Sequence, residues 1–333
     1  MSTSIKTIGI LGAGAWGTAL AEAAASAGCD VVLHAIEKEV VASISEVGEN
    51  RLFLPGVKLN ERIRATGDVA DAIWGADLVL AVMPAQFLRS TLGLVAKSWK
   101  AGVPIVLCSK GIEQNTGKLM SEVAAEALPD APALVLSGPT FASEVARGLP
   151  TGAMLAGKNP ALVATVADAI GTRTFRLYYG TDVIGAEIGG AVKNVIAVAC
   201  GIVEGKKLGD NARATLITRG LAEIVRLAEA KGGRPETLMG LAGVGDLVLT
   251  CNAMQSRNFS FGVEVGRGLT VAAIEAERKT VAEGVHTAAA TVALAETLGV
   301  DMPIVRAVDG VLNHGLVLDD AIQGLLSRPV GEE

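Results

Sequence analysis

The chain is 333 residues long, which allows about two domains of ordinary size, each with a core of its own. Half of the residues are hydrophobic, but only 3% are aromatic and 40 are glycine, so we expect cores of small aliphatic side chains with closely packed backbones. The net charge of −6 argues against a nucleic-acid partner, which needs a basic face, so any bound phosphate must be met by local groups.

The first predicted element is a short apolar strand that runs directly into a glycine-rich loop. The strand covers Thr7 to Leu11, and residues 12–17 (G-A-G-A-W-G) connect it to an alanine-rich helix. A loop of this kind can hold a dinucleotide pyrophosphate on backbone N–H groups, because Gly12, Gly14 and Gly17 lack the Cβ atoms that would keep phosphates away. The pattern therefore predicts a dinucleotide site.

A second predicted strand, Val31 to Leu33, leads to Glu37, which lies 20 residues after Gly17. An acidic residue at this distance can reach the adenosine ribose. A ribose 2′-hydroxyl accepts a carboxylate, whereas a 2′-phosphate requires an arginine. No arginine lies between Val31 and Asn50, so we expect a dinucleotide with a free ribose 2′-hydroxyl to bind at least as well as one with a 2′-phosphate.

Further apolar runs alternate with helical stretches as far as about residue 180. The predicted strands are residues 77–82, 104–108, 133–136, 153–156 and 174–177. Their continuous hydrophobicity indicates a mostly parallel sheet covered on both faces, with the ligand at its carboxyl edge. We therefore predict an α/β fold with a Rossmann-like dinucleotide-binding domain over residues 1–184.

Long helical periods replace the strand pattern after about residue 184. Ile224, Leu227 and Ala228 recur at helical spacing, and Glu223 falls between them on the expected polar face. Residues 185–333 are therefore predicted to form an all-α domain, and the candidate substrate-binding and catalytic residues described next lie mainly in it.

The segment from Gly185 to Val198 is hydrophobic on nearly every helical face, yet it contains Lys193 and a glycine pair at 189–190. Each glycine costs a helix about 1 kcal/mol relative to alanine, so some other group is expected to approach closely there. Burial disfavours the charged form of a lysine, which suits Lys193 to act as a general base. The alternative is a structural ion pair with Glu187 or Asp246, since charge networks also perturb lysines.

Two more segments carry polar groups in an unusual setting. Glycines surround Asp246, which is placed either to bond a substrate hydroxyl or to position Lys193. Ser256, Arg257 and Asn258 present a hydroxyl, a guanidinium and an amide, the donors that a phosphate dianion requires. Ser256 reads equally well as a helix N-cap.

Several short motifs resemble one known family. They are residues 12–20 (GAGAWGTAL), 109–111 (SKG), 137–142 (SGPTFA), 187–194 (EIGGAVKN), 243–247 (GVGDL), 255–258 (QSRN) and 283–285 (EGV). Across residues 7 to about 320 the chain resembles the bacterial NAD(P)-dependent glycerol-3-phosphate dehydrogenases. Phe259-Ser260 departs from the family pattern, which usually continues with arginines.

The resemblance implies a nicotinamide enzyme that interconverts sn-glycerol 3-phosphate and dihydroxyacetone phosphate and supplies glycerol phosphate for phospholipid biosynthesis. It implies Lys193 as the proton acceptor, with no metal. The implied substrate contacts are Lys110, Gly138, Thr140, Asp246, Ser256, Arg257 and Asn258. The implied cofactor contacts, beside the glycine loop and Glu37, are Ala15, Trp16, Lys110, Ala142, Arg257, Val281 and Glu283.

Two other functions compete with this interpretation. A 2-hydroxyacid or ketopantoate-type dehydrogenase of the same architecture would prefer a carboxylate substrate. A non-catalytic dinucleotide sensor would have no use for a lysine buried in a glycine-rich helix.

The remaining signals concern location and partners. The four cysteines are scattered without a C-x-x-C pair, which indicates buried, reduced thiols. No export signal is visible, and the apolar runs are too short for a bilayer. We expect a cytoplasmic protein without integral membrane association, compatible with a homodimer.

Overall fold

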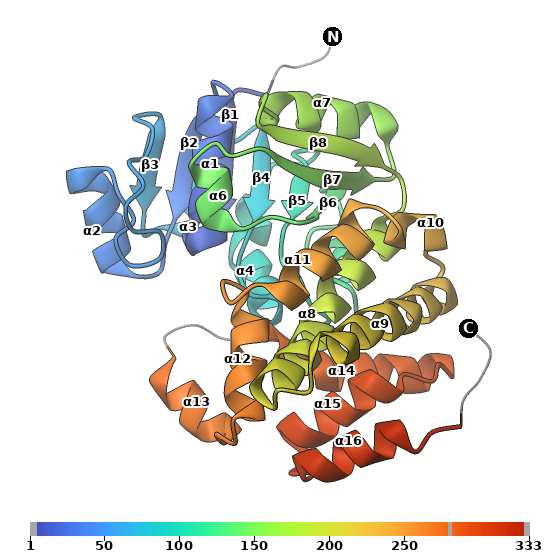
Figure 1. The fold of residues 1–333 in the computed structure, drawn as a ribbon. Helices are drawn as coiled ribbons and strands as arrows, with labels where there is room; N and C mark the ends of the chain where they lie inside the picture. The colour runs from blue at the N-terminus through green and yellow to red at the C-terminus, as the bar shows by residue number, and fades with distance from the viewer. Residues whose placement is uncertain (1–4, 279–281, 330–333) are drawn as a thin grey trace. The chain divides into compact units, whose positions relative to one another are not determined.

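The computed structural model describes residues 5–278 and 282–329, and the chain forms two compact units (Figure 1). The first unit takes the chain as far as Lys110 and then Lys118 to Glu187. The second takes Gly111–Gly117 and the chain from Ile188 onward. The chain therefore passes between the units at 110/111, at 117/118 and inside one helix, at 187/188.

The described part of the first unit contains an eight-stranded sheet in the order β3-β2-β1-β4-β5-β6-β7-β8. Its strands are β1 (Thr7–Leu11), β2 (Asp30–His34), β3 (Ile63–Thr66), β4 (Leu78–Ala81), β5 (Ile105–Leu107), β6 (Ala133–Ser137), β7 (Thr151–Gly157) and β8 (Phe175–Gly180). Neighbouring strands are parallel except for β6 and β7, which pair antiparallel. The predicted α/β class with a mostly parallel sheet is confirmed.

Strand β3 has no counterpart among the strands predicted from the sequence. It is only four residues long, and the side chain of Arg64 points out to an ion pair with Asp71 at 2.6 Å. Arg64 is the one exposed residue among the four, and it interrupts the apolar run that would have marked the strand.

Helices cover both faces of this sheet (Figure 1). They are α1 (Ala15–Ser26), α2 (Lys38–Val47), α3 (Val69–Ile73), η1 (Ala85–Phe87), α4 (Leu88–Val95), η2 (Ala96–Ser98), α5 (Met120–Ala127), α6 (Ala142–Ala146) and α7 (Pro160–Ile170). Helices α1, α6 and α7 pack together, as do α3, α4 and α5. Ile8 and Ile10 of β1 are fully buried beneath these layers, so the core lies along the central strands, as a doubly wound sheet requires.

The described residues of the second unit contain helices and connecting segments but no strand. Its elements are the long helix α8 (Val183–Gly205), which begins in the first unit, and then α9 (Asp210–Lys231), α10 (Pro235–Leu238), the π-helical turn η3 (Leu241–Gly245), α11 (Asp246–Asn252), α12 (Arg257–Gly266), α13 (Val271–Glu277), α14 (Glu283–Leu298), α15 (Pro303–Asn313) and α16 (Leu318–Leu326). The helical character predicted for the second half is confirmed.

Helix α8 is the single helix in the described residues that is long and apolar enough to cross a membrane. Of its most apolar window, 89% is buried inside the protein. Its composition is therefore explained by its place as a core helix.

Glycines on α8 and α12 allow these two helices to pack in backbone contact. A Cβ atom added at Gly201 would lie 2.1 Å from the Phe259 carbonyl oxygen, and one added at Gly262 would lie 2.1 Å from that of Val198. Both distances are far below any real Cβ contact. The close backbone packing expected from the glycine content is found at this contact.

We expect Gly262→Ala to destabilise the protein by about 1–3 kcal/mol, because the new methyl group must push the two backbones apart. The matched control is Gly324→Ala in α16, where the added Cβ atom meets nothing within 4 Å. The control should be neutral or slightly stabilising, since alanine favours a helix. Urea unfolding of both variants measures the difference, and equal stabilities would contradict the packing described.

Glu223 corrects an expectation from the sequence. It is 2% exposed on α9 and does not lie on a polar face. Its carboxylate accepts hydrogen bonds from the backbone N–H groups of Ile304 at 2.7 Å and Val305 at 3.2 Å, in the first turn of α15. The carboxylate thus caps a second helix, a contact that helical spacing alone does not reveal.

Burial raises the pKa of Glu223 to about 7, although the two backbone N–H groups act in the opposite direction. The folded state therefore binds this proton at a higher pH than the unfolded chain does. Protonated Glu223 therefore contributes its full stabilisation below about pH 4.5, and this contribution is lost as the pH rises to about 7. The free energy of unfolding falls by about 3 kcal/mol over this range.

Glu223→Gln keeps an acceptor for α15 and cannot ionise, so its unfolding free energy should fall less between pH 5 and 8 than that of the native protein. Glu229→Gln, an exposed change on the same helix, should keep the native pH slope. Urea unfolding across this pH range gives both slopes. A native slope in Glu223→Gln would show that Glu223 does not titrate there.

Candidate functional site

The glycine loop between β1 and α1 leaves open space at the start of the helix. Gly12 has a φ of +110°, and Gly17 is so close to it that an added Cβ atom would lie 1.8 Å from the Gly12 carbonyl oxygen. These two glycines are therefore required by the turn itself. A Cβ atom at Gly14, in contrast, would meet nothing within 4 Å.

The N-terminus of α1 fits an anionic group. Gly14 is its N-cap residue, no side chain caps it, and its first turn contains no acidic residue. The backbone N–H groups and the helix dipole are thus available to a pyrophosphate. Trp16 lies in this turn, edge-on to Phe175 with ring centroids 6.4 Å apart, and its buried Nε1 has no hydrogen-bond partner within the described chain.

The loops after β5 and β6 bring together three of the predicted substrate residues. Lys110 donates from Nζ to the carbonyl oxygen of Gly138 at 3.2 Å, and Thr140 donates from Oγ1 to the same oxygen at 3.2 Å. Gly138 has a φ of +150°, and a Cβ atom there would lie 2.9 Å from Cα of Ala153. Ala142 follows as the first residue of α6. The first unit therefore places the Lys110 ammonium group beside the Thr140 hydroxyl and the Gly138 carbonyl group.

Glu37 is exposed at the N-cap position of α2, just after β2. Its side chain makes no capping hydrogen bond. Lys38 beside it is also exposed, and Ile36 is 85% exposed. The residues at the end of β2 are thus open to a ligand.

In the second unit, Lys193 is 6% exposed on α8 and forms a buried polar cluster with α11. Its Nζ donates to Oδ1 of Asp246 at 2.6 Å and to Oγ1 of Thr250 at 2.9 Å. Thr250 in turn donates to the Asp246 carbonyl oxygen at 2.6 Å. Of the two ion-pair partners considered for Lys193, Asp246 makes a direct contact, while Glu187 accepts hydrogen bonds from the backbone and hydroxyl of Ser121.

A close backbone approach places Asp246 within reach of Lys193. A Cβ atom at Gly189 would lie 2.4 Å from the carbonyl oxygen of Ala242, in the π-helical turn η3 that leads directly into Asp246. The approach predicted at the glycine pair is therefore confirmed, and its partner is η3. Such π-turns often occur at functional sites.

Thr250 was not among the residues predicted from the sequence. It lies one helical turn after Asp246, on the same face of α11. That spacing is the signal that could have identified it.

The three residues that open α12 differ in their environments. Ser256 is the N-cap, and its Oγ accepts a hydrogen bond from the Phe259 N–H at 3.2 Å, as the capping interpretation predicts. Asn258 is 8% exposed and accepts from the Gly284 N–H at 2.9 Å, which joins α12 to the start of α14. The guanidinium of Arg257 is exposed, and no described residue pairs with it. Arg257 is therefore the available cation at this helix N-terminus.

Two predicted cofactor residues remain. Glu283 is the first residue of α14 and is half-buried. Val281 lies outside the described residues.

The described residues contain no group of three or more histidine, cysteine or acidic side chains that could hold a metal ion. All four cysteines are free and buried, as predicted. Burial raises the pKa of the Cys108 thiol to about 12. The Cys108 thiol is therefore a poor nucleophile.

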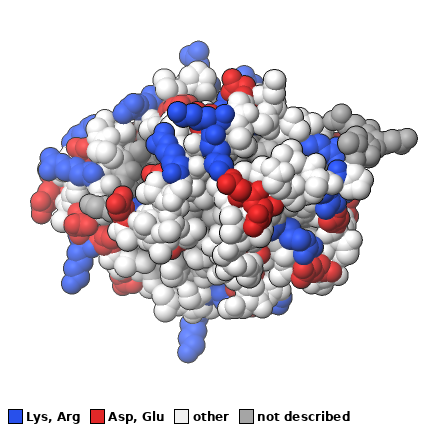
Figure 2. All heavy atoms as spheres, turned by 60° about the horizontal axis from the view of Figure 1, so that its bottom comes forward, with Lys and Arg blue, Asp and Glu red and all other residues white. Residues whose placement is uncertain are grey.

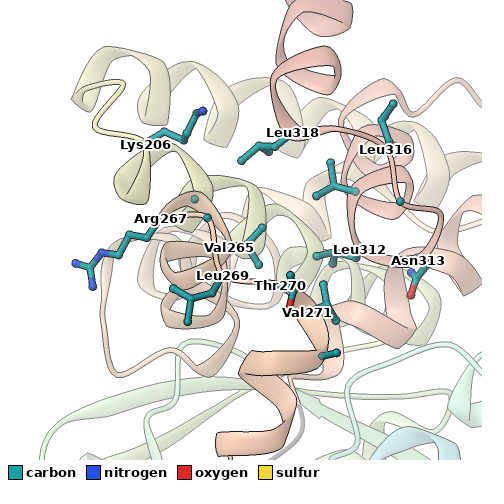
Figure 3. Close-up of a pocket in the computed structure, with 15 residues that line it drawn as sticks. Lys206, Val265, Arg267, Leu269, Thr270, Val271, Leu312, Asn313, Leu316 and Leu318 are labelled. Atoms are coloured by element: carbon teal, nitrogen blue, oxygen red, sulfur yellow. The ribbon is translucent and has the colours of Figure 1, made fainter.

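A separate cavity of about 670 Å³ lies in the second unit, at the ends of α8, α12 and α15 (Figure 3). None of the candidate residues lines it. Its walls are mainly apolar, Lys206 at its edge is paired with Asp319 at 2.5 Å, and Arg267 is directed away from it. Neither of these two lining cations is therefore available to a phosphate group inside the cavity.

A glycine loop at the carboxyl end of a mostly parallel sheet, with a buried lysine cluster on a helical unit, is the arrangement of a two-domain, dinucleotide-dependent oxidoreductase. Family models confirm this class. The model of the NAD-dependent glycerol-3-phosphate dehydrogenase N-terminus matches residues 7–163, and that of the C-terminus matches residues 182–323. The chain belongs to this family.

Individual proteins of this family are similar to the chain over nearly its whole length. A glycerol-3-phosphate dehydrogenase (NAD(P)+) from Parvibaculum lavamentivorans is 54% identical and covers 100% of both chains, and one from Caulobacter vibrioides is 56% identical over 99% of both. A crystal structure of glycerol-3-phosphate dehydrogenase from Coxiella burnetii is 38% identical, with a TM-score of 0.94 over 98% of this chain and 100% of that one. The activity is accordingly an NAD(P)-dependent oxidation and reduction of a small phosphate substrate, sn-glycerol 3-phosphate.

Proposed function

We propose that residues 1–184 of this dehydrogenase bind the dinucleotide and that residues 185–333 carry the catalytic base. The observation that carries the proposal is the buried contact of Lys193 with Asp246 at 2.6 Å. An ion pair removed from water costs several kcal/mol per ion, so stability alone is a weak reason for it. A proton carrier held in one orientation is a sufficient reason.

Lys193 is the proposed proton carrier. In the oxidative direction its neutral amine accepts the proton of the C2 hydroxyl of glycerol 3-phosphate. In the reductive direction its ammonium group returns a proton to the C2 oxygen of dihydroxyacetone phosphate. Asp246 and Thr250 fix the direction of the Nζ hydrogens through bonds of 2.6 and 2.9 Å, so Lys193 meets the substrate with little reorganisation. The nicotinamide ring, when bound, supplies the hydride chemistry.

Arg257 is the proposed partner of the substrate phosphate. Its guanidinium is exposed at the N-terminus of α12, where the helix dipole also favours an anion. The other proposed substrate contacts are Lys110, Gly138, Thr140, Asp246, Ser256 and Asn258. Ser256 and Asn258 also hold the helix start in place.

The proposed cofactor contacts are centred on the glycine loop. They are Gly12, Gly14, Ala15, Trp16, Gly17, Glu37, Lys110, Ala142, Arg257, Val281 and Glu283. The open space at Gly14 and the uncapped first turn of α1 support the placement of the pyrophosphate.

We expect NADH to be used at least as well as NADPH, because an exposed Glu37 repels a 2′-phosphate. Glu37→Arg should raise kcat/KM for NADPH relative to NADH, whereas Glu46→Arg, the same charge change in the last turn of α2, should not. Steady-state rates with both cofactors measure the ratio. A native preference for NADPH of about tenfold, or 1.4 kcal/mol, would show that Glu37 does not face the ribose.

The proposed function also includes a cellular location, a possible partner and a metabolic role. The enzyme would work in the cytoplasm, with or without a homodimeric partner, and supply glycerol phosphate for phospholipid synthesis. The face in Figure 2 carries lysine, arginine, aspartate and glutamate side chains among broad uncharged areas. With a net charge of −6, this distribution supports a small-molecule partner over a nucleic acid.

Oxidation of NADH in the presence of different ketones tests the proposed substrate. Dihydroxyacetone phosphate should be reduced much faster than ketopantoate or another 2-keto acid at equal concentration. A faster reaction with a keto acid would favour the hydroxyacid alternative, and no oxidation with any ketone would favour the sensor.

A further inference from the structure

Asn50 is a fully buried polar residue to which neither the motif pattern nor the proposed function gives a role. It lies in the connection between α2 and β3, distant in sequence from the glycine loop, and its exposure is 0%. Its Nδ2 donates to the carbonyl oxygen of Ala13 at 2.8 Å and to Oγ1 of Thr18 at 2.8 Å. The side chain therefore reaches the middle of the loop from another part of the first unit.

Every polar group of the Asn50 side chain takes part in a hydrogen bond. Its Oδ1 accepts from the Phe53 N–H at 3.1 Å, and its backbone carbonyl accepts from the Leu54 N–H at 2.9 Å. Both amide hydrogens and the amide oxygen are thus used. Because a backbone carbonyl can only accept, the contact with Ala13 requires the amide nitrogen on that side. The orientation of the side chain is fixed by its partners.

Thr18 completes the network within α1. It is 0% exposed, and its Oγ1 approaches the carbonyl oxygens of Gly14 at 2.9 Å and Ala13 at 3.3 Å. The Thr18 N–H also donates to the Gly14 oxygen at 3.0 Å. The two carbonyl groups at the centre of the loop are therefore both held toward the protein interior.

This arrangement determines where the loop N–H groups point. In a planar trans peptide the carbonyl oxygen and the following N–H face opposite ways, and the described residues contain no cis peptide. With the Ala13 carbonyl held on Asn50, the N–H of Gly14 faces away from the interior. That is the residue at which an added Cβ atom would meet nothing within 4 Å. An anion in this space would meet N–H groups rather than carbonyl oxygens.

We propose that Asn50 is a positioning residue for the dinucleotide: through Ala13 and Thr18 it holds the glycine loop in the form that binds the pyrophosphate. The proposal rests on the cofactor site proposed above. Asn50 does not touch the ligand and acts through the peptide between Ala13 and Gly14. Without it, the Ala13 carbonyl loses its buried donor and the peptide is free to turn, which would present an oxygen to the phosphates.

Ligands with and without a pyrophosphate separate this role from a general loss of stability. Calorimetric titration should show that Asn50→Ala weakens the binding of ADP-ribose by about 10-fold and leaves the binding of adenosine unchanged. The matched control is Asn159→Ala, which removes a helix cap with two backbone hydrogen bonds in the same unit. The control should lower the thermal stability without changing either affinity. Equal losses for ADP-ribose and adenosine, or the same effect in the control, would overturn the proposal.

Thr18 provides a second test that does not depend on the folding of Asn50→Ala. Thr18→Val keeps the shape of the side chain but removes its hydroxyl, and should weaken ADP-ribose selectively. Thr18→Ser keeps the hydroxyl and should bind as the native protein does. If the native protein fails to bind ADP-ribose, both the proposed cofactor site and the positioning role of Asn50 are rejected. If the native protein binds and the variants bind equally well, the positioning role alone is rejected.

Discussion

Replacing Lys193 with methionine should lower kcat by about 100-fold or more and leave the binding of NADH intact. Methionine fills much of the volume of the lysine stem but carries no proton. The change removes the Lys193 partner of the buried Asp246 carboxylate, so some loss of stability is also expected. Stopped-flow measurement of NADH oxidation with saturating dihydroxyacetone phosphate gives the rate of the chemical step.

Lys206→Met is the matched control for this change. Lys206 follows α8 directly, and its ammonium is paired with Asp319 on the surface. The control should retain the native kcat, because a partly exposed ion pair contributes little to a distant site. Native turnover in a folded Lys193→Met protein would assign the proton transfer to another group.

Arg257→Gln should raise KM for dihydroxyacetone phosphate by about 10- to 100-fold, since a hydrogen bond to a charged group contributes about 1.5–3 kcal/mol. The weak reduction of unphosphorylated dihydroxyacetone should barely change, because that substrate has no phosphate for Arg257 to meet. Steady-state kinetics on both substrates gives the comparison.

Arg267→Gln is the corresponding control at the other end of α12. This residue is the C-cap, its side chain is exposed, and it should not affect either KM. Equal losses on the phosphorylated and unphosphorylated substrates in Arg257→Gln would indicate a folding or cofactor role for Arg257 instead.

The parts of the fold that follow from local pattern could be predicted from the sequence. Continuous apolar runs mark the central strands, and the glycine loop marks where β1 becomes α1. A buried lysine beside paired glycines marks the site on α8, because a charge and a weak helix former are both costly in a core helix. These features mark Lys193 itself, whereas its partners Asp246 and Thr250 are known only from the structure.

Contacts made across distant segments were not predictable in this way. Strand β3 owes its existence to pairing with β2, and Gly111–Gly117 joins the second unit although the chain on either side belongs to the first. Glu223 was assigned to a polar face because helical spacing cannot show that α15 begins beside it. Asn50 is a single polar residue in an irregular segment, and only the structure shows that it bonds the Ala13 carbonyl.

The most direct test of the proposed mechanism is a crystal structure of the protein with NAD⁺ and sn-glycerol 3-phosphate bound. Lys193 Nζ should lie about 2.6–3.2 Å from the C2 oxygen while Asp246 keeps its contact, and the guanidinium of Arg257 should contact the phosphate. A complex in which Lys193 contacts only Asp246 and Thr250, with another group on the C2 oxygen, would contradict the assignment of Lys193 as the base.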